Sequence, residues 1–249
     1  MLQLSKYCAS GNDFVIFHAL YGADRSGLAI TLCDRQRGVG ADGLIVIIPH
    51  ENHDFEWEFY NADGSTASMC GNGSRACAHY AHRFGLAEFK MEFLTGAGVI
   101  KASVVGDMVQ SDLTPPYVIN DEIEEYDMKW WLVDTGVPHL VTFDANMENF
   151  DIEMARSLRH KYNANVNIAH VASNGSIAVR TYERGVEDET LACGTGMAAC
   201  FYRATIEELV ADNARVYPKS GETLYLGLDN ETITFKGEVQ AVFETVWRG

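Results

Sequence analysis

The sequence contains one short phrase twice, and this repeat constrains the fold more than any other feature. Residues 69–80 read MCGNGSRACAHY and residues 192–203 read ACGTGMAACFYR. A shift of 123 positions, from Cys70 to Cys193, aligns the two Cys-Gly-x-Gly turns and the small residues that follow them. This shift is close to half of the 249-residue chain, so we infer two similar halves.

The residues around each phrase predict several strands and one helix in each half. DFEWEFYN (54–61) alternates large apolar and charged residues, as a half-buried strand does, and SIAVRTYER and ETLYLGLDNETITF indicate further strands. After Cys70 and Cys193, small and apolar residues recur at helical spacing, and Gly85 offers a stop for the first helix. We therefore expect an α/β (α+β) fold of two pseudo-symmetric domains, each a curved mixed sheet wrapped around a central helix.

The boundary between the halves is predicted at the Pro115-Pro116 pair, where TPPYVIND (114–121) is typical of a linker. The first domain then spans residues 1–117 and carries Cys70, and the second begins at residue 118 and carries Cys193. The acidic run DEIEEYD (121–127) is expected to be a solvated face. The four tryptophans are most simply packing aromatics.

Composition excludes several classes of partner. Nineteen Lys and Arg against 35 Asp and Glu give a net charge of −16, which argues against nucleic acids and anionic membrane surfaces. No run of 18 apolar residues and no export signal is found, so we expect a cytoplasmic protein with reduced thiols. The six cysteines include no Cys-x-x-Cys, and the spacing of Cys77, His79 and His82 is not a standard metal pattern, so no metal is expected.

The two repeated cysteines differ from the others in their expected place. Cys70 and Cys193 each precede a predicted helix, where free amides and the helix dipole stabilise a thiolate. Two such groups on opposite sides of a cleft between the domains could invert a stereocentre. One thiolate would remove the α-proton from one face and the other thiol would protonate the opposite face. Cys33, Cys77 and Cys200 are interpreted as small buried residues.

Six segments together resemble the diaminopimelate epimerase family over essentially the whole chain. They are SGNDF (10–14), GVGADG (38–43), YNADGS (60–65), MCGNGSRA (69–76), YERG (182–185) and ACGTG (192–196). The resemblance implies a cofactor-independent isomerase of lysine and peptidoglycan precursor biosynthesis that interconverts LL- and meso-2,6-diaminopimelate. It also implies a homodimer, and a last strand, about residues 238–249, that returns to the first domain and leaves residues 118–237 to the second.

The resemblance assigns roles by position. Cys70 and Cys193 match the catalytic thiols, and His139 and Glu183 match residues that support proton transfer. The implied substrate-binding positions are Asn12, Asn61, Gly71, Asn72, Asn165, Glu183, Arg184, Gly194 and Thr195. One position departs from the pattern, because Val137 stands where many members of the family carry Asn.

Two other functions remain open from the sequence. A proline or hydroxyproline racemase-like enzyme would share the scaffold and the thiol pair, but Asn72 and the SGNDF and YERG motifs favour diaminopimelate. A thiol redox protein would instead join Cys70 and Cys193 in a disulfide. Such a protein would keep its activity without Asn12, Asn165 or Arg184, whereas an epimerase would not.

Overall fold

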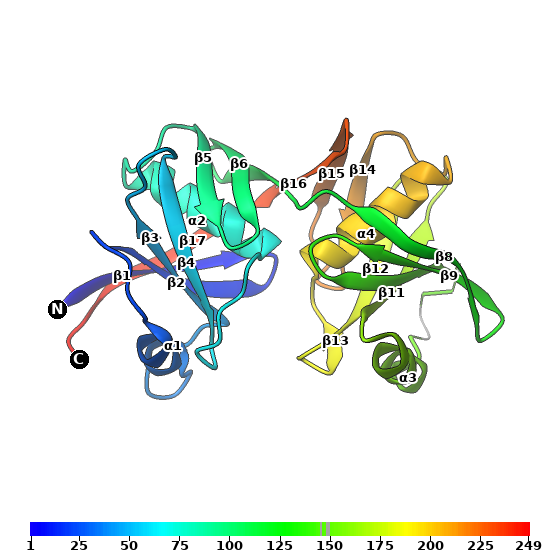
Figure 1. The fold of residues 1–249 in the computed structure, drawn as a ribbon, viewed down its shortest axis with the longest axis horizontal. Helices are drawn as coiled ribbons and strands as arrows, with labels where there is room; N and C mark the ends of the chain where they lie inside the picture. The colour runs from blue at the N-terminus through cyan, green and yellow to red at the C-terminus, as the bar shows by residue number, and fades with distance from the viewer. Residues whose placement is uncertain (145, 148–149) are drawn as a thin grey trace. The chain divides into compact units, whose positions relative to one another are not determined.

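The computed structural model describes residues 1–144, 146–147 and 150–249. These residues form two compact units, Met1–Ser111 with Lys236–Gly249 and Asp112–Phe235 (Figure 1). Each unit combines strands with two helices in the described part of the chain, so the predicted mixed α/β class is confirmed. The chain passes from one unit to the other within strands β7 (Met108–Asp112) and β16 (Thr232–Glu238).

The first unit is a mixed sheet with helices α1 (Ser26–Cys33) and α2 (Gly71–Arg83). Its strands are β1 (Leu2–Ala9), β2 (Asn12–His18), β3 (Gly43–Ile48), β4 (Phe55–Asn61), β5 (Lys90–Thr95), β6 (Gly98–Val105), β7 and β17 (Gln240–Trp247). β1 pairs antiparallel with β2 and β17, β2 runs parallel to β3, and β3 runs antiparallel to β4. β4 runs parallel to β5, which continues antiparallel into β6 and β7. The C-terminal strand therefore lies beside the N-terminal one.

The second unit carries helices α3 (Ile152–Tyr162) and α4 (Gly194–Ile206). Its strands are β8 (Tyr117–Glu125), β9 (Met128–Asp134), β10 (Pro138–Phe143), β11 (Asn165–Val171), β12 (Ile177–Glu183), β13 (Asp188–Thr190), β14 (Asn213–Tyr217), β15 (Leu224–Asp229) and β16. β9 pairs antiparallel with β8 and β10, β10 runs parallel to β11, and β11 runs antiparallel to β12. β12 then runs parallel to β14, which pairs antiparallel with β15. This order of strand directions repeats that of the first unit.

Helices α2 and α4 form the centre of their units. α2 contacts β1, β2, β3 and β6, and α4 contacts β9, β10, β11, β12 and β15. Residues 71–81 of α2 are all buried, as in a helix that the rest of its unit surrounds, and most of them have small side chains. α2 ends where Gly85 adopts a φ of +67°, a left-handed conformation that glycine adopts without strain. The predicted helices after both cysteines and the predicted stop are confirmed.

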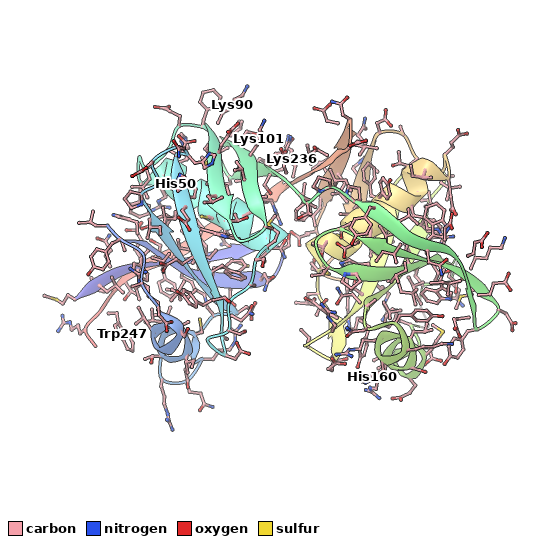
Figure 2. All side chains as sticks on the ribbon, viewed as in Figure 1. His50, Lys90, Lys101, His160, Lys236 and Trp247 are labelled. Atoms are coloured by element: carbon pink, nitrogen blue, oxygen red, sulfur yellow. The ribbon has the colours of Figure 1, made fainter. Side chains whose placement is uncertain are left out.

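The residues interpreted as packing elements lie where that interpretation placed them. Cys33 ends α1, and Cys33, Cys77 and Cys200 are free, buried thiols whose pKa is raised by burial, in Cys33 to about 11. Trp57 and Trp130 are buried in the cores of their units. Trp247, labelled in Figure 2, packs against the apolar cluster that α1 forms with strands β1, β2 and β3.

One local prediction needs correction. The segment interpreted as a linker, residues 114–121, is irregular only up to Pro116, and β8 begins at Tyr117. β8 pairs with β9 from Tyr117 to Glu125, with two irregularities in register, so the residues after the two prolines belong to a sheet and not to a linker. The acidic run lies largely on this strand, and Ile123 within it turns into the core. In the part of the chain that the structure describes, no helix combines the length and apolar character that crossing a membrane requires.

Candidate active site

Cys70 is the residue at which α2 begins. Its backbone is extended, with φ −149° and ψ 114°, and its sulfur accepts a hydrogen bond from the Gly73 amide at 3.3 Å. A Cβ on residue 73 would lie 3.2 Å from the Cys70 Cβ and 3.4 Å from its sulfur, so glycine keeps this approach open. The first amides of a helix carry partial positive charge, which favours the thiolate over the thiol. Cys70 is half-buried.

Cys193 holds the same position in α4. Its backbone is also extended, with φ −123° and ψ 108°, and its sulfur lies 3.6 Å from the hydroxyl oxygen of Thr195. The side chain is buried, and the next residue, Gly194, packs closely against the Phe235 ring. Each unit therefore presents one cysteine at the N-terminus of its central helix.

The β1–β2 hairpin places Asn12 beside the start of α2. Its two-residue turn, Ser10-Gly11, has positive φ at both positions, as type I′ turns do. Asn12 donates from Nδ2 to Asp42 Oδ2 at 2.7 Å and accepts at Oδ1 from Asn72 Nδ2 at 3.2 Å. The orientation of both amides is thereby fixed, since an amide nitrogen only donates and an amide oxygen only accepts.

A buried arginine completes this contact on the helix side. Arg75 has no exposed surface, and its Nη2 donates to Asn72 Oδ1 at 2.8 Å and to Ser10 Oγ at 2.6 Å. Arg75 thus ties the hairpin turn to the first turn of α2. The sequence alone did not indicate a role for Arg75 or Asp42, although Arg75 follows Asn72 by three residues, which puts both on one helix face.

Behind Asn12 lies an ion cluster around Asp13. Its carboxylate accepts hydrogen bonds from Lys6 Nζ at 2.7 Å and from both terminal nitrogens of Arg35, at 3.0 and 2.9 Å. Burial alone would raise the pKa of Asp13, but the bonds from Arg35 and Lys6 outweigh it and hold the pKa at about 2. Asp13 is therefore charged throughout the physiological range and anchors the strand that carries Asn12.

This cluster predicts an acid-sensitive contribution to stability. The unfolded chain protonates Asp13 near the usual value of 3.8, whereas the folded protein keeps it charged down to about 2. Asp13 therefore stabilises the fold at pH above about 4, and this contribution disappears as the pH falls from about 4 towards 2. Urea midpoints measured between pH 2 and 7 should fall less steeply with acid in Asp13→Asn than in the parent. Asp121→Asn, on the exposed part of β8, is the control, and parallel curves for Asp13→Asn and the parent would contradict the prediction.

In the second unit the corresponding polar group centres on His139, the second residue of β10. His139 has no exposed surface, and burial lowers its pKa to about 3, so its ring is neutral at physiological pH. The ring nitrogen Nε2 lies 2.9 Å from Thr195 Oγ1 and 3.4 Å from Asn165 Nδ2, and Nδ1 lies 3.1 Å from Asn167 Nδ2. The structure thus connects His139 to the turn that follows Cys193.

Asn165 joins this group to the end of β12. Its Oδ1 accepts the backbone amide of Arg184 at 2.8 Å, so the side chain of Asn165 spans the space between His139 and the YERG segment. Glu183 is the last residue of β12 and is half-buried. The guanidinium of Arg184 donates to the Asn163 carbonyl at 2.9 Å. Asn167 follows Asn165 by two strand positions and so shares its face, although no motif in the sequence marks it.

Asn61 takes a different place from the other predicted binding residues. It ends β4, and its Nδ2 donates to Ser65 Oγ at 3.0 Å within the turn that follows. The Ala62 amide donates to the Asp42 carbonyl at 3.0 Å, which brings this turn next to the residue that holds Asn12. Asn61 therefore adjoins the Asn12 group through the backbone of Asp42.

The arrangement in each unit suits the binding and ionisation of small polar groups. Each helix start combines a cysteine, a glycine and one amide or hydroxyl side chain with the amides of the first turn, a combination that holds carboxylates and stabilises thiolates. Among residues 1–144, 146–147 and 150–249, no cluster of three His, Cys, Asp or Glu side chains is arranged to hold a metal ion.

Comparison with known proteins gives a consistent result over the full length of the chain. The family model described as diaminopimelate epimerase matches residues 4–119 and 131–242. The diaminopimelate epimerase of a Nitratiruptor species is 59% identical over 248 residues, covering 100% of this chain and 99% of the relative. That of Campylobacter lari is 55% identical over 243 residues, covering 98% of each chain.

Solved structures with low sequence identity have the same fold. A probable proline racemase from Agrobacterium radiobacter K84, with bound carbonate, superposes with a TM-score of 0.78 at 14% identity, covering 100% of this chain and 93% of that one. A phenazine biosynthesis protein from Bacillus anthracis superposes with a TM-score of 0.73 at 18% identity, covering 98% of each chain. At this level of identity the likeness concerns the fold alone.

Proposed function

This chain belongs to the diaminopimelate epimerase family, and we propose that Cys70 and Cys193 are the two thiols by which it inverts one α-carbon of 2,6-diaminopimelate. The enzyme is an isomerase of lysine biosynthesis and interconverts the LL and meso forms. The observation that carries the proposal is the matched position of the two cysteines, each at the N-terminus of a buried central helix.

The proposed reaction moves two protons and leaves no net change except stereochemistry. The thiolate of one cysteine takes the α-proton, and the electron pair of the broken C–H bond passes to the α-carbon and its carboxylate. The thiol of the other cysteine then donates its proton to the opposite face of that carbon. The reverse reaction exchanges the two roles. The mechanism requires that both thiols reach one α-carbon from opposite faces.

The carboxylate at the reacting centre is assigned to the two helix starts. The segments Gly71-Asn72 and Gly194-Thr195 offer backbone amides in the first turns of α2 and α4, and such amides bind anions. They also stabilise the negative charge that builds on the carboxylate when the proton leaves. His139 and Glu183 support the transfer, and His139 does so as a neutral ring whose pKa is lowered by burial.

The distal, non-reacting end of the substrate is assigned to the polar residues around these helix starts. It carries a second carboxylate and ammonium group, for which a guanidinium and side-chain amides are complementary. Arg184 would exchange its carbonyl contact with Asn163 for the substrate carboxylate. The amides come from three positions of the implied binding set, Asn12, Asn61 and Asn165. Val137 supplies no hydrogen-bonding side chain, so any contact at that position depends on its neighbours.

The proposal includes the larger organisation of the protein. We assign residues 1–117 and about 238–249 to an N-terminal domain and residues 118–237 to a C-terminal domain, each a sheet wrapped around its central helix. The repeated order of strand directions supports an origin by duplication. The chemistry needs no cofactor, and the protein is proposed to be a cytoplasmic homodimer.

The function is tested by incubating the purified, reduced protein with LL-diaminopimelate without pyridoxal phosphate and separating stereoisomers chromatographically. The proposal predicts formation of the meso form until both are present in comparable amounts. L-proline and trans-4-hydroxy-L-proline serve as alternative substrates and should remain unchanged. Inversion of either imino acid without turnover of diaminopimelate would overturn the substrate assignment while leaving the paired thiols in place.

A further inference from the structure

The hydrogen bonds around His139 fix which of its ring nitrogens carries the proton. Asn167 Nδ2 donates to the Leu140 carbonyl at 3.2 Å, and Asn167 Oδ1 accepts from Thr181 Oγ1 at 2.9 Å. These two partners set the orientation of the Asn167 amide, so its NH2 group faces His139 Nδ1 at 3.1 Å. An amide nitrogen donates and does not accept, so Nδ1 is the acceptor nitrogen. In a neutral ring the proton is then on Nε2.

Among the described residues, the proton on Nε2 has one acceptor within ordinary hydrogen-bond distance, the hydroxyl of Thr195 at 2.9 Å. Asn165 Nδ2 also lies near Nε2, at 3.4 Å, but its amide is oriented by the bond from the Arg184 amide to its Oδ1, so it presents hydrogens there. That distance exceeds the normal range for a hydrogen bond. Thr195 Oγ1 therefore accepts from His139 and keeps its own proton for another partner.

The sulfur of Cys193 is within reach of that proton. Thr195 Oγ1 and Cys193 Sγ are 3.6 Å apart, a normal distance for a hydrogen bond to sulfur. Because the Thr195 hydroxyl already accepts from His139, its proton is available for the sulfur. The bonds thus run in one direction, from Asn167 to His139, from His139 to Thr195, and from Thr195 to Cys193.

The first unit reaches a similar result by another route. Under the 123-residue shift, Asn72 corresponds to Thr195 and Gly73 to Gly196. At Cys70 the donor to sulfur is the Gly73 amide, and Asn72 is bonded to Asn12 and Arg75. At Cys193 the corresponding side chain, Thr195, carries a hydroxyl rather than an amide, and this hydroxyl lies within hydrogen-bond distance of the sulfur.

We propose that His139 is a positioning residue, which holds the Thr195 hydroxyl so that its proton stabilises the thiolate of Cys193. This inference rests on the proposed function, since it assigns how one of the two catalytic thiols is kept ionised. It gives His139 a part in proton transfer without a change in its own charge. The neighbouring titratable groups are Arg184, which with burial lowers the pKa of His139, and Cys200 on α4, which is buried.

The test measures the ionisation of Cys193 directly and needs no substrate. A thiolate absorbs ultraviolet light at wavelengths where a thiol absorbs little. The ultraviolet absorbance of Cys70→Ala minus that of the double variant Cys70→Ala/Cys193→Ala, measured as a function of pH, therefore reports the ionisation of Cys193 alone. Thr195→Val is then added to both proteins, because it removes the hydroxyl and keeps the shape. The pH midpoint of the Cys193 titration is expected to rise by about one pH unit in Thr195→Val, because the thiolate loses a hydrogen bond to a charged acceptor.

Three further variants separate positioning from general effects on the helix. Thr195→Ser keeps the hydroxyl and should leave the midpoint close to the parent value. His139→Leu should raise the titration midpoint of Cys193 as Thr195→Val does. His139→Gln, whose amide can still donate towards Thr195, should raise it less. Thr205→Val removes a hydroxyl that bonds within the last turns of α4 and is the matched control.

The outcomes decide the inference independently of the epimerase assay. An unchanged midpoint in Thr195→Val overturns it, and so does an equal shift in Thr205→Val, which would indicate a general loss of helix stability. A shift in Thr195→Val with none in His139→Leu would leave Thr195 as the donor and overturn the role of His139. A protein that fails to turn over diaminopimelate but gives the expected titration would contradict the proposed function and not this hydrogen-bond sequence.

Discussion

Replacement of Cys70 or of Cys193 by alanine is expected to lower kcat/KM for diaminopimelate at least about 10³-fold, in the upper part of the range for loss of a general acid or base. Either change removes one of two groups that must act on opposite faces of the same carbon, so both directions of the reaction are lost together. Each cysteine stands at the N-terminus of its central helix, and in the proposed mechanism the remaining thiol serves only one face of the carbon.

The repeated phrase supplies its own matched controls. Cys77 and Cys200 each lie seven residues after a proposed catalytic thiol, in the same helix, and are fully buried. Alanine at either position removes one sulfur from the core and should cost about 1 kcal/mol of stability, with kcat/KM within a few-fold of the parent. The two-thiol account fails if Cys70→Ala or Cys193→Ala, folded as judged by circular dichroism, retains activity close to that of the parent.

Gly196→Ala is expected to be the most damaging small substitution near Cys193. A Cβ at this position would lie 2.3 Å from Asn167 Oδ1, 3.2 Å from Thr181 Oγ1 and 3.3 Å from His139 Cε1. None of these groups can move freely, because each is hydrogen-bonded inside the unit. We expect a loss of about 3 kcal/mol in the free energy of unfolding, at the upper end of overpacking costs. Activity should fall as well, since the His139–Thr195 contact is displaced.

Gly27 in α1 provides the comparison for this prediction. A Cβ there meets nothing within 4 Å, so Gly27→Ala tests the helix propensity of alanine without a clash. It should be neutral or stabilising by up to about 1 kcal/mol. Denaturant unfolding of the two variants measures the difference. Equal stability of Gly196→Ala and Gly27→Ala would show that the hydrogen-bonded side chains around His139 can move aside at little cost. That result would contradict the description of the start of α4 as rigid.

The parts of the fold that follow local rules could be predicted from the sequence. The helices after Cys70 and Cys193, the stop at Gly85 and the half-buried strand β4 each follow from spacing and turn chemistry. The linker prediction was wrong for residues 117–121, because pairing of β8 with β9 depends on residues that the local pattern does not contain. Tertiary hydrogen bonding decided that segment.

The candidate site divides in the same way. The sequence assigned roles to some residues of the motifs, but not to the side chains that orient them. Asp42, Arg75 and Asn167 each reach a motif residue through the fold, and the contacts of Asp42 with Asn12 and of Asn167 with His139 join positions far apart in sequence. The sequence also could not indicate that His139 would be fully buried and neutral, since burial depends on α4 covering β10.

The most direct test of the central claim is a reaction of protiated LL-diaminopimelate in deuterated water, stopped at low conversion. Two opposed thiols predict meso product with one deuterium at the inverted α-carbon, while the unreacted LL substrate remains free of deuterium. Each thiol would exchange its proton with solvent, so deuterium would enter the α-carbon only when the opposite thiol protonates it. Product that retains protium at that carbon, or substrate and product labelled equally at low conversion, would contradict the account, since both are signs of a single base.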